Sequence, residues 1–253
     1  MALPSAHPPL PGFLRALGHE IRWQLVAALA NSDLRVQELV ARVKRPQNLV
    51  SYHLLKLRES GLVRERRSIS DSREIYYSVD LDRIRTLITE TGEALHPGLI
   101  PAASLPVKRP RGKPPVRTLF LCTHNSARSQ MAEGLLRTLG GRAVEVFSAG
   151  TETAQVHPLA VRAMDDLSID IRGQSSKLLD IYRNELFDYV ITVCDRAREN
   201  CPVFPGHPEQ IHWSFPDPAA VEGSDEDRFE AFRATAIQLK TRISYFLLML
   251  ERG

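Results

Sequence analysis

Cysteine and arginine are the residue types in this 253-residue chain best suited to covalent chemistry. Cys122 and Arg128 are separated by five residues in CTHNSARS, after the apolar run 116–121 and before a helical pattern at 129–139. A loop between strand and helix can point several backbone N–H groups at one tetrahedral oxyanion, while a guanidinium binds two of its oxygens. The same loop favours a thiolate, so we expect Cys122 to have a lowered pKa and to act as a nucleophile.

The predicted oxyanion loop consists of the residues that follow this nucleophile. Asn125 and Ser126 suit a tight polar turn, and the Ser129 hydroxyl can bond the thiolate. The alternative is an inert buried cysteine with an unrelated surface arginine, and the strand end and polar loop weigh against it. Within the loop, we expect His124 to face solvent. The oxyanion-binding residues are predicted to be Thr123, His124, Asn125, Ser126, Ala127, Arg128 and Ser129.

The second half of the chain alternates between strand and helix patterns. After the first strand, we expect strands at 144–148, 189–193 and 211–213, with helices at 158–166 and 225–250. This alternation predicts an α/β fold with a four-stranded parallel sheet, covered by helices and binding ligands at the carboxyl ends of its strands. Cys122 and Cys194 both follow strands, so the two thiols are expected to converge on one crevice.

The first half is predicted to form a winged helix-turn-helix domain. Apolar spacing indicates helices near 21–29, 36–43 and 46–61, a hairpin over 62–79 and a last helix at 81–91. In this plan the helix before the hairpin enters the major groove, and the hairpin meets the phosphate backbone. An ordinary exposed helix with a charged hairpin is the alternative. The candidate DNA-binding residues are Gln47, Asn48, Ser51, Tyr52, Lys56, Arg64, Arg66, Arg67 and Arg73.

Charge and composition divide the chain at a linker rich in proline and basic residues. Residues 1–115 carry a net charge of +7 and residues 116–253 one of −4; a basic half suits DNA, although a solvated surface of mixed sign would also explain it. We therefore expect a DNA-binding domain at 10–95, a linker at 96–115 and a catalytic domain at 116–253. No apolar run approaches the ~20 residues of a membrane-spanning helix, and the chain does not start like a secretory signal, so no membrane contact and a cytoplasmic location are expected.

Two motifs in the first half resemble the ArsR-type winged-helix repressors. They are LVSYHLLKLRESGLV at 49–63 and EIYYSV at 74–79. The resemblance implies a homodimer that binds double-stranded operator DNA of palindromic sequence.

The second half resembles the low-molecular-weight tyrosine phosphatase fold and, within it, the thioredoxin-coupled arsenate reductases. The motifs are CTHNSARSQMAEG at 122–134, SAGT at 148–151, HPLAVRAM at 157–164 and IHWSFPDPA at 211–219. These reductases carry two further cysteines seven residues apart, here Cys194 and Cys201 in VCDRARENCP. An ordinary phosphatase needs neither.

The resemblance implies a relay of three thiols. Cys122 attacks arsenate, with Asp217 as general acid; Cys194 then attacks Cys122 and arsenite leaves. Cys201 next forms a disulfide with Cys194, which thioredoxin reduces after the segment 195–200 rearranges. No bound cofactor is expected, and no His/Cys cluster has the spacing of a metal site. Asp217 could instead simply begin a turn. The alternative functions are a low-molecular-weight protein tyrosine phosphatase and a transcription factor whose oxyanion pocket only senses its ligand or thiol state.

Overall fold

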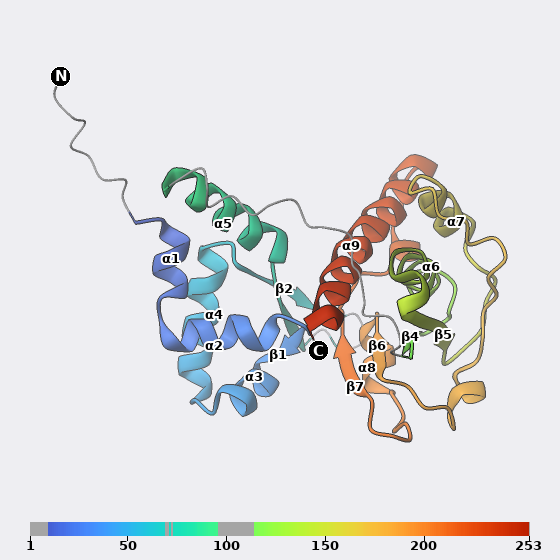
Figure 1. Cartoon of the computed structure of the whole chain (residues 1–253), viewed down its shortest axis with the longest axis horizontal. Coiled ribbons are helices and arrows are strands. Elements are labelled where there is room, and N and C mark those ends of the chain that lie inside the picture. The colour runs from blue at the N-terminus through green and yellow to red at the C-terminus, as the bar shows by residue number, and fades with distance from the viewer. Residues whose placement is uncertain (1–9, 69–70, 72, 96–113, 253) are drawn as a thin grey trace. The chain divides into compact units, whose positions relative to one another are not determined.

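The chain divides into two compact units, Met1–Leu105 and Pro106–Gly253. The computed structural model describes residues 10–68, 71, 73–95 and 114–252, coloured in Figure 1. Nearly all of the predicted linker, 96–113 of 96–115, lies outside the described residues.

The first unit is a winged helix-turn-helix domain, as predicted from its motifs. Its short sheet is antiparallel in the order β1-β3-β2, with β2 and β3 forming the expected hairpin. The sequence patterns missed α1 and β1, because a six-residue helix and a two-residue strand are too short to show a period. The elements are α1 (Gly12–Leu17), α2 (Glu20–Leu29), β1 (Leu34–Arg35), α3 (Val36–Val43), α4 (Gln47–Glu59), β2 (Val63–Arg67), β3 (Ile75–Val79) and α5 (Leu81–Leu95).

Helix α4 is bounded and oriented by its own sequence. Pro46 precedes it, at a position where a missing N–H costs nothing, and Gly61 follows it with a φ of 69° that glycine adopts readily. Val50, Leu54 and Leu57 form the predicted inward stripe and are fully buried. The opposite side of α4 is therefore left to solvent.

The second unit is a four-stranded parallel sheet flanked by helices, also as predicted. The strand order is β5-β4-β6-β7, so β4 lies in the interior of the sheet between β5 and β6. The main elements are β4 (Val116–Cys122), α6 (Arg128–Gly140), β5 (Val144–Gly150), α7 (Pro158–Asp165), β6 (Tyr189–Thr192), α8 (Asp195–Glu199), β7 (Glu209–His212) and α9 (Asp225–Arg252). Three short 3-10 helices are η2 (Gly141–Ala143), η3 (Leu179–Tyr182) and η4 (Pro218–Ala220).

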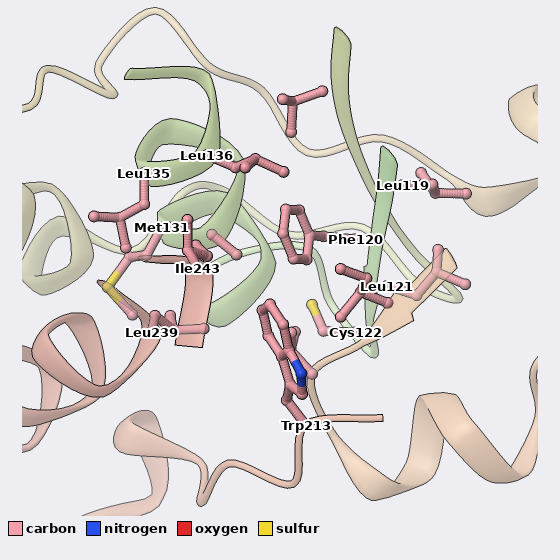
Figure 2. Close-up of a cluster of buried hydrophobic side chains, with 14 of the residues drawn as sticks. Leu119, Phe120, Leu121, Cys122, Met131, Leu135, Leu136, Trp213, Leu239 and Ile243 are labelled. Carbon is pink, nitrogen blue, oxygen red and sulfur yellow. The ribbon is translucent and has the colours of Figure 1, made fainter. Parts of the chain in front are cut away.

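An apolar core surrounds β4 and fixes the position of its last residue, Cys122. Figure 2 shows Cys122 at the end of the strand with Phe120 and Trp213 beside it. The rings of Phe120 and Trp213 have centroids 6.0 Å apart. Helix α6 packs against α9, and Leu135 and Leu239 are among the fully buried residues that the two helices contribute. Among the described residues, no helix is both long and apolar enough to cross a lipid bilayer.

Candidate active site

The loop between β4 and α6 curls back onto the Cys122 thiol. The backbone N–H of Asn125 donates to the Cys122 sulfur over 3.0 Å, and the Ser129 hydroxyl lies 2.8 Å from the same sulfur. Asn125 has a φ of 47°, a left-handed conformation that asparagine tolerates better than most residues. The predicted contact between Ser129 and Cys122 is therefore present, and the loop is closed around a buried sulfur.

The side chain of Asn125 holds this loop to its surroundings. Its Nδ2 donates to the hydroxyls of Ser129 and Ser148, each over 2.8 Å. Its Oδ1 accepts from the Lys177 backbone N–H over 2.8 Å and from Gln130 Nε2 over 3.0 Å. Both ends of the buried amide are satisfied, which rigidifies the loop. The sequence predicted Asn125 as part of a tight turn and of the oxyanion-binding loop, but not these side-chain contacts. Ser148 stands in the quoted motif SAGT, and its contact with Asn125 joins segments distant in sequence.

Gly150, the last residue of β5, lies against the other side of the loop. A Cβ atom there would be 2.5 Å from the Thr123 carbonyl oxygen and 2.8 Å from the Asn125 backbone nitrogen. No side chain fits at that distance. Sequence reasoning did not single out Gly150, although it stands in SAGT.

Arg128 and Asp217 lie side by side at the candidate site. The buried guanidinium of Arg128 donates to the Phe215 carbonyl over 3.1 Å and to Asp217 Oδ2 over 2.8 Å. The other oxygen of Asp217 accepts from the Ala219 backbone N–H over 3.1 Å and caps η4. Asp217 thus begins a turn, as one interpretation expected, and also contacts the arginine.

The predicted lowering of the Cys122 pKa is wrong for the loop in this structure. Burial raises the pKa of Cys122 and the neighbouring Cys194 adds to the rise, while Ser129, Arg128 and the Asn125 N–H act in the opposite direction. Burial prevails because the thiolate would lose its hydration, and because the Arg128 charge is balanced by Asp217. Burial therefore favours the protonated thiol over the thiolate in this structure.

The structure brings the second cysteine to this loop. Cys194 follows β6 and is buried, and its sulfur lies 3.4 Å from the hydroxyl oxygen of Thr123. Cys201 follows α8 and is half-buried; burial raises its pKa, against a smaller opposing effect of Arg198. All three thiols are free. The expected convergence thus holds for Cys122 and Cys194.

The remaining loop residues form its outer part. His124 is exposed, as expected, and its Nδ1 lies 3.1 Å from Glu152 Oε2. Ser126 is half-buried and its carbonyl accepts from the His157 backbone N–H over 2.8 Å, whereas Ala127 is buried. Within the described part of the chain, no group of three or more His, Cys, Asp or Glu could hold a metal ion.

In the first unit, the residues predicted to contact DNA lie on α4 and on the hairpin. Lys56 is half-buried, pairs with Glu59 over 2.8 Å and lies above the Tyr52 ring. The other four α4 residues are exposed: Gln47, Asn48, Ser51 and Tyr52.

The hairpin arginines differ in their contacts. Arg64 forms an ion pair with Asp80, and Arg73 forms one with Asp71 over 2.9 Å. Arg67 is exposed, and Arg66 is half-buried with its guanidinium donating to the Arg67 carbonyl over 2.8 Å.

Comparison with known proteins gives matches for both units. The model of the low molecular weight phosphotyrosine protein phosphatase family matches residues 117–253, and that of the arsR family of bacterial regulatory proteins matches residues 19–65. An arsenate reductase of Halalkalibacterium halodurans is 43% identical over 127 residues, 50% of this chain and 91% of that protein. One from Bacillus subtilis is 39% identical with the same coverage. A solved structure of an arsenate reductase in a phosphate-binding state is 33% identical, covering 53% of this chain and 98% of that one with a TM-score of 0.44.

Proposed function

The chain belongs to the low molecular weight phosphotyrosine protein phosphatase family, fused to a regulator domain of the arsR family, and on that premise we propose that it reduces arsenate to arsenite and binds operator DNA. The observation that carries the enzymatic part is the buried Cys194 thiol, 3.4 Å from Thr123 in the oxyanion loop. A phosphatase reaction uses Cys122, Arg128 and an acid, and it has no use for a second thiol at that position. Relatives that are named arsenate reductases support the same choice of substrate.

In the first step, arsenate binds in the loop and condenses with the Cys122 thiol. The arsenate oxygens bind the Arg128 guanidinium in competition with Asp217. The released Asp217 carboxylate takes up the thiol proton and, as general acid, passes it to the departing hydroxyl. The sulfur bonds to arsenic and one arsenic–oxygen bond breaks. The thiol proton and the departing hydroxyl leave together as water, so the reaction can start from a protonated thiol.

In the second step, Cys194 attacks the sulfur of Cys122. A sulfur–sulfur bond forms, the sulfur–arsenic bond breaks, and its electron pair stays on arsenic. Arsenic is thereby reduced from As(V) to As(III) and leaves as arsenite, which takes up the Cys194 thiol proton, while the two cysteines are oxidised to a disulfide. The position of Cys194 beside Thr123 supports an attack without a large movement of this residue.

In the third step, Cys201 attacks Cys194 and releases the Cys122 thiol. The new disulfide between Cys194 and Cys201 is then reduced by an external dithiol protein of the thioredoxin type, which takes the place of a bound cofactor. This step requires movement in the segment that contains α8, because Cys201 follows that helix whereas Cys194 precedes it.

The regulatory half of the proposal assigns DNA contact to the first unit. Helix α4 presents polar side chains to solvent, and amides such as those of Gln47 and Asn48 can bond adenine edges. The net charge of +7 on residues 1–115 favours a polyanion. We propose that two copies of the chain pair through this unit on a palindromic operator.

Arsenate-dependent NADPH oxidation, coupled through thioredoxin and its reductase, tests the proposed reaction. We expect turnover by the full chain and loss of more than about a hundredfold in both Cys194→Ser and Cys201→Ser, since the relay is broken. Hydrolysis of p-nitrophenyl phosphate by the same two variants should be retained, because it uses only the loop and Asp217. If arsenate turnover survived both substitutions, the relay would be excluded; phosphate-ester hydrolysis without arsenate turnover would indicate a phosphatase.

A further inference from the structure

A buried polar cluster adjoins Cys194 and has no part in the chemistry proposed above. Asp195, the first residue of α8, accepts from the Ser214 hydroxyl over 2.7 Å and lies 3.2 Å from His212 Nε2. The other ring nitrogen of His212 is 2.8 Å from the Thr192 hydroxyl oxygen. Asp195 is 3% exposed and His212 0%, so these are interior contacts. A carboxylate is costly to bury, and it persists in a core only where it is well bonded.

This cluster ties residues on both sides of Cys194 to the end of β7. Thr192 precedes Cys194 by two residues and Asp195 follows it directly, and both contact His212. Backbone bonds hold the same stretch: the Val193 N–H donates to the Leu121 carbonyl over 2.8 Å, and the Trp213 N–H donates to the Thr192 carbonyl over 2.9 Å. Cys194 is thus fixed on either side, next to the oxyanion loop.

The backbone of the chain that follows is bonded locally, although Ala197 is buried in the core. The backbone N–H groups of Arg198, Asn200 and Cys201 donate to carbonyls at residues 194, 196 and 198, all within the same segment. Val203 is 86% exposed. Local bonds of this kind move with the segment, whereas bonds from Asp195 to β7 must break if Asp195 moves.

From this contrast we infer that Asp195 and His212 are positioning residues, which hold the Cys194 thiol for attack on Cys122 and restrict the later rearrangement to residues 196–203. The inference rests on the proposed relay and adds to it which part of the segment stays fixed. Cys194 remains at the loop through both disulfide exchanges, and Cys201 is the thiol that travels. Of the segment 195–200 that was expected to rearrange, Asp195 therefore stays in place and the residues after it move.

The exchange between Cys122 and Cys194 can be measured without arsenate. In the full chain carrying Cys201→Ser, hydrogen peroxide oxidises the Cys122 thiol, through its thiolate fraction, to a sulfenic acid and is itself reduced to water. The Cys194 thiol then attacks that sulfur and forms the disulfide, and the displaced hydroxyl leaves as water with the thiol proton. Dimedone trapping reports the first step, and mass spectrometry of the disulfide reports the second. A failure of arsenate turnover would therefore not obscure the result.

Three substitutions in that background test the positioning role. Asp195→Ala should slow disulfide formation by about tenfold or more, because the Cys194 thiol is then no longer held in position for attack on Cys122. Ser214→Ala, which removes one bond to Asp195, should slow it by about threefold to tenfold. Asp195→Asn should restore the rate to within about threefold, since the amide oxygen still accepts both bonds. Dimedone trapping of Cys122 should stay within about twofold throughout.

Ser244→Ala provides the matched control, because the Ser244 hydroxyl donates to the Lys240 carbonyl on the exposed side of α9. Its disulfide rate should equal that of the parent. The inference is overturned if Asp195→Ala behaves like this control, if Asp195→Asn is as slow as Asp195→Ala, or if trapping and disulfide formation slow together, which indicates a general structural role.

Discussion

At the scale of single residues, the state of the Cys122 thiol decides how the site can react. Its sulfur is bonded by the Asn125 N–H and the Ser129 hydroxyl, both of which favour a thiolate, yet burial raises its pKa. The groups that could stabilise the anion are thus in place but are outweighed while Arg128 is paired with Asp217. A bound oxyanion would change that pairing, so the reactivity of the free enzyme should differ from that of the complex.

The raised pKa predicts how alkylation of Cys122 depends on pH. The thiolate reacts and the thiol does not, so the rate rises about tenfold per pH unit as long as the pH lies below the pKa. In the Cys194→Ser, Cys201→Ser variant, the rate with iodoacetamide should therefore keep climbing from about pH 7 to about pH 9. A plateau reached already near neutral pH would contradict the prediction and would indicate a loop that ionises the thiol.

Gly150 gives a second prediction at this scale. In Gly150→Ala the added methyl group meets the Thr123 carbonyl at 2.5 Å, so the loop must shift away from the position that binds the oxyanion. We expect activity to fall by about a hundredfold and stability by about 1–3 kcal/mol. The control is Gly173→Ala, because a Cβ at Gly173 meets nothing within 4 Å. Equal turnover in the two variants would show that the loop tolerates displacement.

At the scale of helices and strands, much of the molecule could be predicted because its patterns are local. The inward stripe of α4, the apolar strand β4 and the loop spacing between Cys122 and Arg128 can all be recognised in contiguous sequence. The short elements β1 and α8 were not predicted, because two and five residues carry no period. The contacts of Asn125 with Ser148 and Lys177, and of Asp195 with His212, join distant segments that only the fold brings together.

Burial of the Cys122 sulfur, which a sequence pattern does not report, explains why the predicted lowering of its pKa was wrong. The motif around Cys122 indicates donors to a thiolate, and those donors are present. How deeply the sulfur is buried is a property of packing between elements. Its effect on the pKa therefore becomes visible only in the structure.

Helix α4 and the hairpin should contribute differently to DNA binding. Gln47 faces solvent at the start of α4, so Gln47→Ala should weaken binding by about 1–3 kcal/mol for the preferred operator and little for unrelated DNA. Arg67 is exposed on β2, so Arg67→Ala should weaken binding to the operator and to unrelated DNA by a similar factor. It should also reduce the slope of log affinity against log salt concentration by about one. Titrations on operator and random duplexes at several salt concentrations measure both. Identical behaviour of the two variants would refute this division.

At the scale of the whole molecule, the two units have separate interiors. One cluster of buried residues includes Leu25, Leu39 and Leu54 of the first unit, and the other includes Phe120 and Leu239 of the second. The two clusters share no residue, and the net charges of the two halves have opposite sign. Each unit is of a size that can support its own core.

Separate cores predict separate unfolding transitions. Leu239→Ala creates a cavity between α9 and α6, so it should lower the unfolding free energy of the second unit by about 2–5 kcal/mol and leave the first unit unchanged. Leu54→Ala should do the reverse, and Ile237→Ala, at a residue half-exposed on α9, should shift neither by more than about 0.5 kcal/mol. Urea unfolding of the full chain, followed by Trp23 and Trp213 fluorescence in single-tryptophan variants, resolves the two units.

If both tryptophans reported one transition that moved with either leucine substitution, the units would be coupled. In that case, binding of an oxyanion in the loop could change the affinity of the first unit for DNA. Independent transitions would instead mean that the two activities are linked only by the chain that joins the units.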